Sequence, residues 1–111
     1  MLFDARFLPN PFFVLNLRRL DGRTLEVNRF LEEQPDYDRF LRHLEDLLTF
    51  VMPRFVAEGK SYLTIAIGCT GGRHRSVAIA ERLGRFLAQS GFPVTISHRD
   101  LEREAERSQT G

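Results

Sequence analysis

The chain has 111 residues, of which 42% are hydrophobic and 28% are charged, and its net charge is +1. This composition excludes a disordered chain and argues against a broad nucleic-acid binder, which carries an excess of positive charge. No apolar run is long enough to cross a bilayer, and the first residues lack the pattern of a signal peptide. We therefore expect a single soluble domain over residues 1–111, in the cytoplasm and away from membranes. The single cysteine, Cys69, fits a reducing compartment.

The first half of the chain predicts one strand and two helices. Residues Leu2–Leu8 alternate in polarity, as a strand does, and stop at a Pro-Asn-Pro segment. A threonine that can cap a helix precedes Leu25–Glu33, whose apolar residues lie on one side. Apolar residues recur at helical spacing over Tyr37–Phe55, and Pro53 is expected to kink this helix or end it early.

The second half predicts two more strands and two more helices. Tyr62–Ile67 is a continuous apolar and β-branched run, which is typical of a strand buried on both faces. A helix is expected over Arg75–Ser90, with Gly91 as its C′ residue. A shorter strand is predicted over Pro93–His98, followed by a charged helix over Asp100–Ser108.

Strands that alternate with helices favour an α/β fold with three layers, in which helices flank a mostly parallel sheet with right-handed crossovers. In such sheets, ligands bind beyond the carboxyl ends of the strands. These ends lie at Arg6–Asn10, Gly68–Thr70 and His98–Arg99. We therefore expect the polar groups of these three segments to share one edge of the sheet.

The loop Gly68–Ser76 joins the predicted buried strand to an amphipathic helix and has the composition of an anion site. Its three glycines let a ligand approach the backbone, and the first amides of the helix have no internal partners. The candidate ligand-binding residues are Thr70, Gly71, Gly72, His74, Arg75 and Ser76, together with Arg6, Asn10 and His98 at the same edge. We expect phosphate, sulfate or a sugar phosphate as the ligand. No metal or other cofactor is expected, because the three histidines lack metal-ligand spacing.

Some of these assignments have simpler alternatives. The glycines could form only a turn between strand and helix. Arg6 could serve only in an ion pair with Asp4, and His98 could make an internal hydrogen bond. The chain has no Gly-x4-Gly-Lys-Ser/Thr pattern, which excludes a P-loop of the ATP-binding type.

The same loop also allows an enzymatic interpretation. Cys69, five intervening residues, Arg75 and Ser76 reproduce the Cys-x5-Arg-Ser/Thr signature of protein tyrosine phosphatases, which also lies between a strand and a helix. A Cys69 thiolate would attack phosphorus while Arg75 held the phosphate oxygens. The chain departs from that pattern at Gly68, where those enzymes usually have histidine, and it has no recognisable acid-loop motif. We therefore expect a domain without enzymatic activity, with a phosphatase as the runner-up.

Two long phrases of the sequence carry a family resemblance. FDARFLPNP at residues 3–11 and SYLTIAIGCTGGRHRSV at residues 61–77 look like the C-terminal domain of the RNase adapter protein RapZ and its relatives. These proteins were formerly described as P-loop nucleotide-binding proteins. The likeness covers nearly the whole chain, through residue 102.

The resemblance implies a regulatory domain that resembles a phosphofructokinase subdomain. In enteric bacteria, this domain senses glucosamine-6-phosphate and binds small regulatory RNA that controls amino-sugar synthesis. The family's sugar-phosphate contacts carry over to Thr70, Gly71, His74 and Arg75. The resemblance also implies an RNase as a partner, and an N-terminal nucleotide-binding P-loop domain that is missing here. We expect this chain to act with a partner domain or as a homo-oligomer.

The chain departs from the enteric relatives in two places. Phe12 stands where the enteric site has a histidine, a difference that bears on the sugar rather than on the phosphate. Residues 99–107 interleave acids with arginines, whereas the enteric RNA-binding end is strongly basic. Because this balance weakens attraction to RNA, we expect weaker RNA binding than in the family. A pure RNA- or protein-interaction module is the third alternative.

Overall fold

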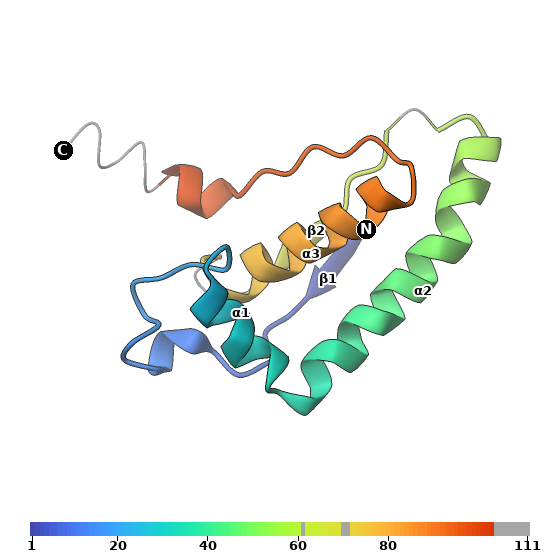
Figure 1. Ribbon diagram of the computed structural model, residues 1–111. Helices are drawn as coiled ribbons and strands as arrows, with labels where there is room; N and C mark the ends of the chain where they lie inside the picture. Colours follow the sequence, from blue (N-terminus) through green and yellow to red (C-terminus); the bar gives the residue numbers. More distant parts are fainter. Residues whose placement is uncertain (61, 70–71, 104–111) are drawn as a thin grey trace.

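Figure 1 shows a computed structural model of the chain, which describes residues 1–60, 62–69 and 72–103. The elements in chain order are β1 (Leu2–Asp4), the 3-10 helix η1 (Pro11–Phe13), α1 (Leu25–Glu32), α2 (Pro35–Ala57), β2 (Ala66–Gly68) and α3 (Arg75–Gln89). Residues 99–103 are also helical. This mixture of strands and helices confirms the predicted α/β class.

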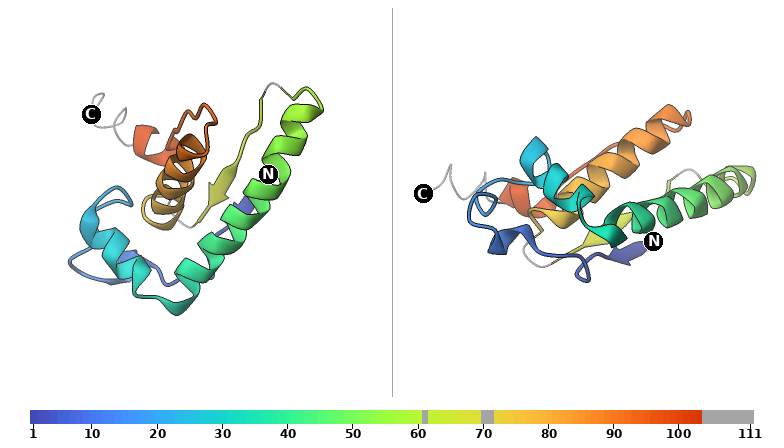
Figure 2. Two further views of the ribbon diagram at one scale, coloured as in Figure 1. Left: turned by 45° about the vertical axis from the view of Figure 1, so that its right-hand side comes forward. Right: turned by 60° about the horizontal axis from the view of Figure 1, so that its bottom comes forward.

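The two strands form a parallel sheet, in which Leu2 pairs with Ala66 and Asp4 pairs with Gly68. The three α-helices cover one face of this sheet, as the right-hand view of Figure 2 shows. Ile67 packs against the core on that face, while Leu2 is 76% exposed. The described residues therefore form two layers rather than the predicted three. The likeness to a phosphofructokinase subdomain stays a prediction.

The first two strands are shorter than the sequence predicts. β1 ends at Asp4 rather than Leu8, because the Asp4 carboxylate accepts a hydrogen bond from the Arg6 amide at 2.9 Å and turns the chain. β2 begins only at Ala66, and Tyr62 is 92% exposed. The prediction that this strand is buried on both faces is therefore wrong, since the helices cover only one face.

The predicted third strand, Pro93–His98, is wrong, because this segment has no regular secondary structure. It runs back along α3 (Figure 1), and the side chain of Ile96 packs against Gly84 of that helix. A Cβ atom at Gly84 would overlap Ile96, so glycine permits the close approach. Within the described residues, no backbone hydrogen bond joins this segment to β2. The segment is therefore held by a helix and does not extend the sheet.

The helix predictions are confirmed with one correction. The Thr24 hydroxyl accepts a backbone hydrogen bond at 3.4 Å and caps α1 as expected. α2 continues through Pro53 to its end at Ala57, so the predicted early end is wrong. A proline costs a helix one hydrogen bond, but neighbouring side chains of α2 still pack against the core. Gly91, with a φ of +93°, follows α3 as its C′ residue. The predicted last helix is helical over residues 99–103, and the rest of it lies outside the described residues.

Apolar side chains of the helices fill the space against the inner face of the sheet. Those that are buried include Val27 and Leu31 of α1, Tyr37, Leu41, Leu44 and Leu48 of α2, and Val77, Ile79, Leu83 and Leu87 of α3. This packing holds α3 beside β2, so that the start of the helix lies next to the end of the strand. Within the described residues, no helix combines the length and the hydropathy that a membrane span requires.

Candidate anion-binding site

The candidate site lies at the junction between β2 and α3. The strand ends at Gly68, and the helix begins at Arg75. Gly72 has a φ of +59°, a backbone conformation that favours glycine and turns the chain into the helix. The predicted ligand-binding residues Thr70 and Gly71 lie outside the described residues.

Arg75 is the most buried cation of this junction, with an exposed fraction of 3%. Its Nη1 atom donates hydrogen bonds to the carbonyl oxygens of Arg6 and Leu8, both at 2.9 Å. These bonds tie the first turn of α3 to the turn that follows β1. The Nε atom is buried and has no hydrogen-bond partner, and among the described residues no carboxylate lies within ion-pair distance of the guanidinium. The structure therefore buries a positive charge at the start of α3. Two carbonyl oxygens hold this charge, and the exposed Asp4 carboxylate acts on it from beyond ion-pair distance.

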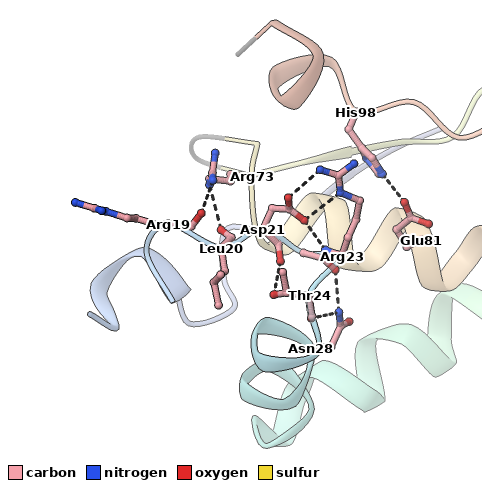
Figure 3. Close-up of polar contacts among 10 residues, drawn as sticks. Arg19, Leu20, Asp21, Arg23, Thr24, Asn28, Arg73, Glu81 and His98 are labelled. Atoms are coloured by element: carbon pink, nitrogen blue, oxygen red, sulfur yellow. Dashed lines mark hydrogen bonds and ion pairs between the residues drawn. The ribbon is translucent and has the colours of Figure 1, made fainter. Parts of the chain in front are cut away.

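His74 and Arg73 hold the loop that precedes α1. The buried His74 Nε2 lies 3.0 Å from the carbonyl oxygen of Leu17 and must be the donor, because a carbonyl only accepts. Arg73 donates from Nε to the Leu20 carbonyl at 3.1 Å and from Nη2 to the Arg19 carbonyl (Figure 3). Both side chains therefore bind the protein's own backbone. The ligand contact predicted for His74 stays a prediction.

A cavity of about 420 Å³ opens beside the loop. One wall is formed by Gly68, Cys69, Gly72 and Ser76, and another by residues 97–100. The Ser76 amide, in the first turn of α3, donates to the Cys69 sulfur at 3.3 Å. This cavity brings the predicted residues Gly72 and Ser76 together with His98, and its size suits a small ligand.

The candidate residues outside the loop, Arg6, Asn10 and His98, contact other residues of the protein. The Arg6 guanidinium pairs with the Asp4 carboxylate at 2.6 Å, and hydrogen bonds from Arg6 are the main cause that lowers the pKa of Asp4. The Asn10 side chain accepts a hydrogen bond from the Phe12 amide and caps η1. His98 Nε2 lies 2.8 Å from the Glu81 carboxylate (Figure 3). The ion pair and the internal hydrogen bond, which are the simpler alternatives for Arg6 and His98, are therefore present, and the ligand contacts of these residues stay predictions.

Sequence reasoning missed two features of the site. The Asp100 carboxylate packs directly against Gly72, so closely that a Cβ atom there would overlap it. The side chains of Arg73, His74 and Arg75 donate hydrogen bonds to the backbone carbonyls of residues 6, 8, 17 and 20. Asp100 follows the predicted edge segment His98–Arg99, a signal that could have placed it near the loop. Backbone carbonyls leave no signal in a sequence. Among the described residues, no group of three or more potential ligands could hold a metal.

Comparisons with known proteins place relatives along almost the whole chain. The chain is 50% identical to a nucleotide-binding protein of Cereibacter sphaeroides over 105 residues, which cover 95% of this chain and 35% of the relative. It is 55% identical to a nucleotide-binding protein of Trichlorobacter lovleyi over 103 residues, which cover 93% and 36%. A similar protein of Anaeromyxobacter shares 55% identity over 104 residues, which cover 94% and 35%. The chain thus spans about a third of the length of these relatives.

The match to one protein family covers nearly the whole chain. The sequence model of the RapZ C-terminal domain matches residues 1–102, a span that includes β1, the glycine loop and α3. The predicted resemblance is thereby confirmed, and the chain belongs to the RapZ C-terminal domain family.

Proposed function

We propose that this domain is a regulatory sensor that binds a phosphorylated metabolite of the glucosamine-6-phosphate type at the junction between β2 and α3. Membership of the RapZ C-terminal domain family supports a regulatory role. The single observation that carries the ligand class is the cavity at the N-terminus of α3, whose wall includes Gly72 and Ser76. A phosphate in this cavity would meet the positive end of the helix, next to the buried charge of Arg75.

The energetics of burial favour such a ligand. A charge taken out of water is costly unless another charge and further hydrogen bonds compensate it. The carbonyls of Arg6 and Leu8 supply hydrogen bonds but only partial negative charge. The N-terminus of α3, a helix of 15 residues, adds a second positive field at the same place. The Ser76 hydroxyl, at the wall of the cavity, would add a donor to a phosphate oxygen.

Calorimetric titration with inorganic phosphate, glucosamine-6-phosphate and glucosamine tests this proposal. We expect both phosphates to bind and glucosamine to give no signal. Ser76→Ala should weaken phosphate binding by about fivefold, the cost of one hydrogen bond. Ser90→Ala is the matched control, because it removes an exposed serine hydroxyl at the opposite end of α3. A parent protein that binds neither phosphate would end the proposal.

The relatives' names refer to nucleotide binding, and we assign that property to the rest of their length. The chain has no P-loop sequence of the ATP-binding type, and it spans about 35% of those relatives. We therefore expect ATP and GTP to leave the melting temperature of this domain unchanged at concentrations where inorganic phosphate raises it.

The regulatory output that we propose is small-RNA binding in the control of amino-sugar metabolism, together with an RNase partner or a second copy of the domain. Arg99 and Arg103 begin the charged end of the chain that would contact RNA phosphates. A filter-binding titration across salt concentrations tests this, since phosphate contacts weaken steeply with salt. Arg99→Ala should lower RNA affinity, while Arg54→Ala, at an exposed position of α2, should leave it unchanged.

A Cys-dependent phosphatase is the second candidate. The hydrogen bond from the Ser76 amide to the Cys69 sulfur favours it, because amides at a helix N-terminus stabilise a thiolate. Arg75, however, directs Nη1 to two backbone carbonyls rather than to the loop. Turnover of p-nitrophenyl phosphate that disappears in Cys69→Ser would establish the enzyme. We expect no turnover in either protein.

A further inference from the structure

Asp100 lies over the loop at the point where the chain turns into α3. Gly72 has a positive φ, and a Cβ atom built on it would overlap the carboxylate of Asp100. The carboxylate therefore packs on the bare Cα of the glycine. No other side chain could stand at position 72 while Asp100 keeps this place.

The Asp100 carboxylate is weakly engaged by the rest of the protein. Its ion-pair partner within the described residues is the neighbouring Arg99, whose Nε atom lies 3.9 Å away. The Asp100 side chain is 39% exposed and borders the same 420 Å³ cavity as Cys69 and Ser76. A negative charge thus stands at the mouth of the proposed phosphate site without a strong partner.

The segment that carries Asp100 is fixed at one end. His98 contacts the Glu81 carboxylate at 2.8 Å, and Ile96 packs against Gly84, so both are held by α3. Residues 99–103 follow as a short helix whose hydrogen bond to the His98 carbonyl, from Glu102, measures 3.0 Å. This helix therefore begins directly after the part of the segment that contacts α3.

We propose that Asp100 is an autoinhibitory carboxylate, which occupies the mouth of the phosphate site until an anionic ligand displaces it. The inference rests on the proposed function, since it concerns the regulation of the same site. A phosphate bound beside Gly72 and Ser76 would meet the Asp100 charge inside a partly enclosed cavity, where repulsion is screened less than in water. Ligand binding therefore moves residues 99–103 away from the loop, and this movement reports the ligand to a partner.

Titration of inorganic phosphate into the parent protein, Asp100→Asn and Glu102→Gln tests the proposal. Asparagine keeps the shape of Asp100 and removes its charge, so we expect phosphate to bind about tenfold more tightly at low salt. This gain should shrink at 1 M salt, because the repulsion is screened. Glu102→Gln removes the same charge two positions along the same helix and should change the dissociation constant by less than twofold. Circular dichroism verifies that each variant is folded, and Asp100→Ser replaces Asp100→Asn if that variant unfolds.

The outcomes separate this inference from the proposed function. If the parent binds phosphate and Asp100→Asn binds it equally or more weakly, the autoinhibitory role is wrong and the proposed function stands. If neither protein binds phosphate, both the proposed function and this inference are wrong. Hydrogen exchange gives an independent readout: phosphate should speed exchange at residues 99–103 of the parent, and unchanged exchange there would overturn the displacement.

Discussion

Two buried polar atoms lack a hydrogen-bond partner among the described residues, and they lie in different environments. One is the hydroxyl of Tyr37 in α2, which is 1% exposed within the apolar core. The other is Nε of Arg75, at the start of α3. The tyrosine is neutral, and burial raises its pKa to about 12, so it stays neutral at any ordinary pH. The arginine is charged, and its Nη1 already holds two backbone carbonyls.

The difference shows how the two regions are built. Around Tyr37 apolar side chains pack closely together. The desolvation cost of one hydroxyl without a hydrogen-bond partner is small, and the apolar contacts outweigh it. Around Arg75 the protein joins separate parts of the chain through backbone carbonyls, and the nearest influence of opposite charge is the Asp4 carboxylate, which acts from beyond ion-pair distance. The first region therefore stabilises the fold by packing, whereas the second joins separate segments at the place where we propose that a ligand binds.

The largest effect is expected from Arg75→Ala, which removes the link between α3 and the turn after β1. The carbonyls of Arg6 and Leu8 lose their donor, and the free energy of unfolding should fall by about 3 kcal/mol. Arg75→Lys keeps the charge but not the forked donors, and should lose about half as much. Urea denaturation measures both. A loss below 0.5 kcal/mol for the alanine variant would show that Arg75 does not join these segments.

Gly22→Ala should destabilise the same junction, because Gly22 packs against the start of α3. A Cβ atom at Gly22 would overlap the backbone of His74 and Ala78, neither of which can rotate away. We expect a loss of about 2 kcal/mol in the free energy of unfolding. Gly68→Ala is the control, because the nearest atom to its Cβ, the Phe3 carbonyl oxygen, lies at 3.9 Å, an ordinary contact. Equal losses in the two variants would contradict this account.

The two regions also differ in how well the sequence predicts them. The helical spacing predicts the ends of α1 and α3 to within one residue, because an amphipathic pattern is local and one face must be buried. It also predicts α2, although this helix runs through Pro53, where an early end was expected. The strand Pro93–His98 was predicted from the same kind of local pattern and is wrong, because its pairing depends on a neighbour that no local pattern specifies. The site follows the same rule. The glycines of the loop predict a turn between strand and helix. The direction of the Arg75 side chain, in contrast, depends on carbonyls almost 70 positions away in sequence.

Tyr37→Phe tests the account of the apolar region around Tyr37. Removing a buried hydroxyl that has no partner removes its desolvation cost and leaves the packing of the ring unchanged. We therefore expect the free energy of unfolding to rise by about 1 kcal/mol, measured by urea denaturation. A decrease would mean that the hydroxyl has a partner in solution, such as a bound water. Tyr62→Phe, at a fully exposed ring, is the control and should have no effect.

The smallest effect is expected from Asp21, a carboxylate with a direct ion-pair partner, which Arg75 lacks among the described residues. It accepts two side-chain hydrogen bonds from Arg23 in the loop that Arg73 holds (Figure 3), and these bonds lower the pKa of Asp21 below 3.8. A lowered pKa in the folded state stabilises the protein above about pH 4, and this stability is lost as the pH falls through the folded value. Because Arg23 is more than half exposed, the contribution should be at most about 1 kcal/mol. Urea midpoints measured from pH 6 to pH 2 should fall less steeply for Asp21→Asn than for the parent. Parallel slopes would mean that the ion pair adds nothing to the stability of the junction.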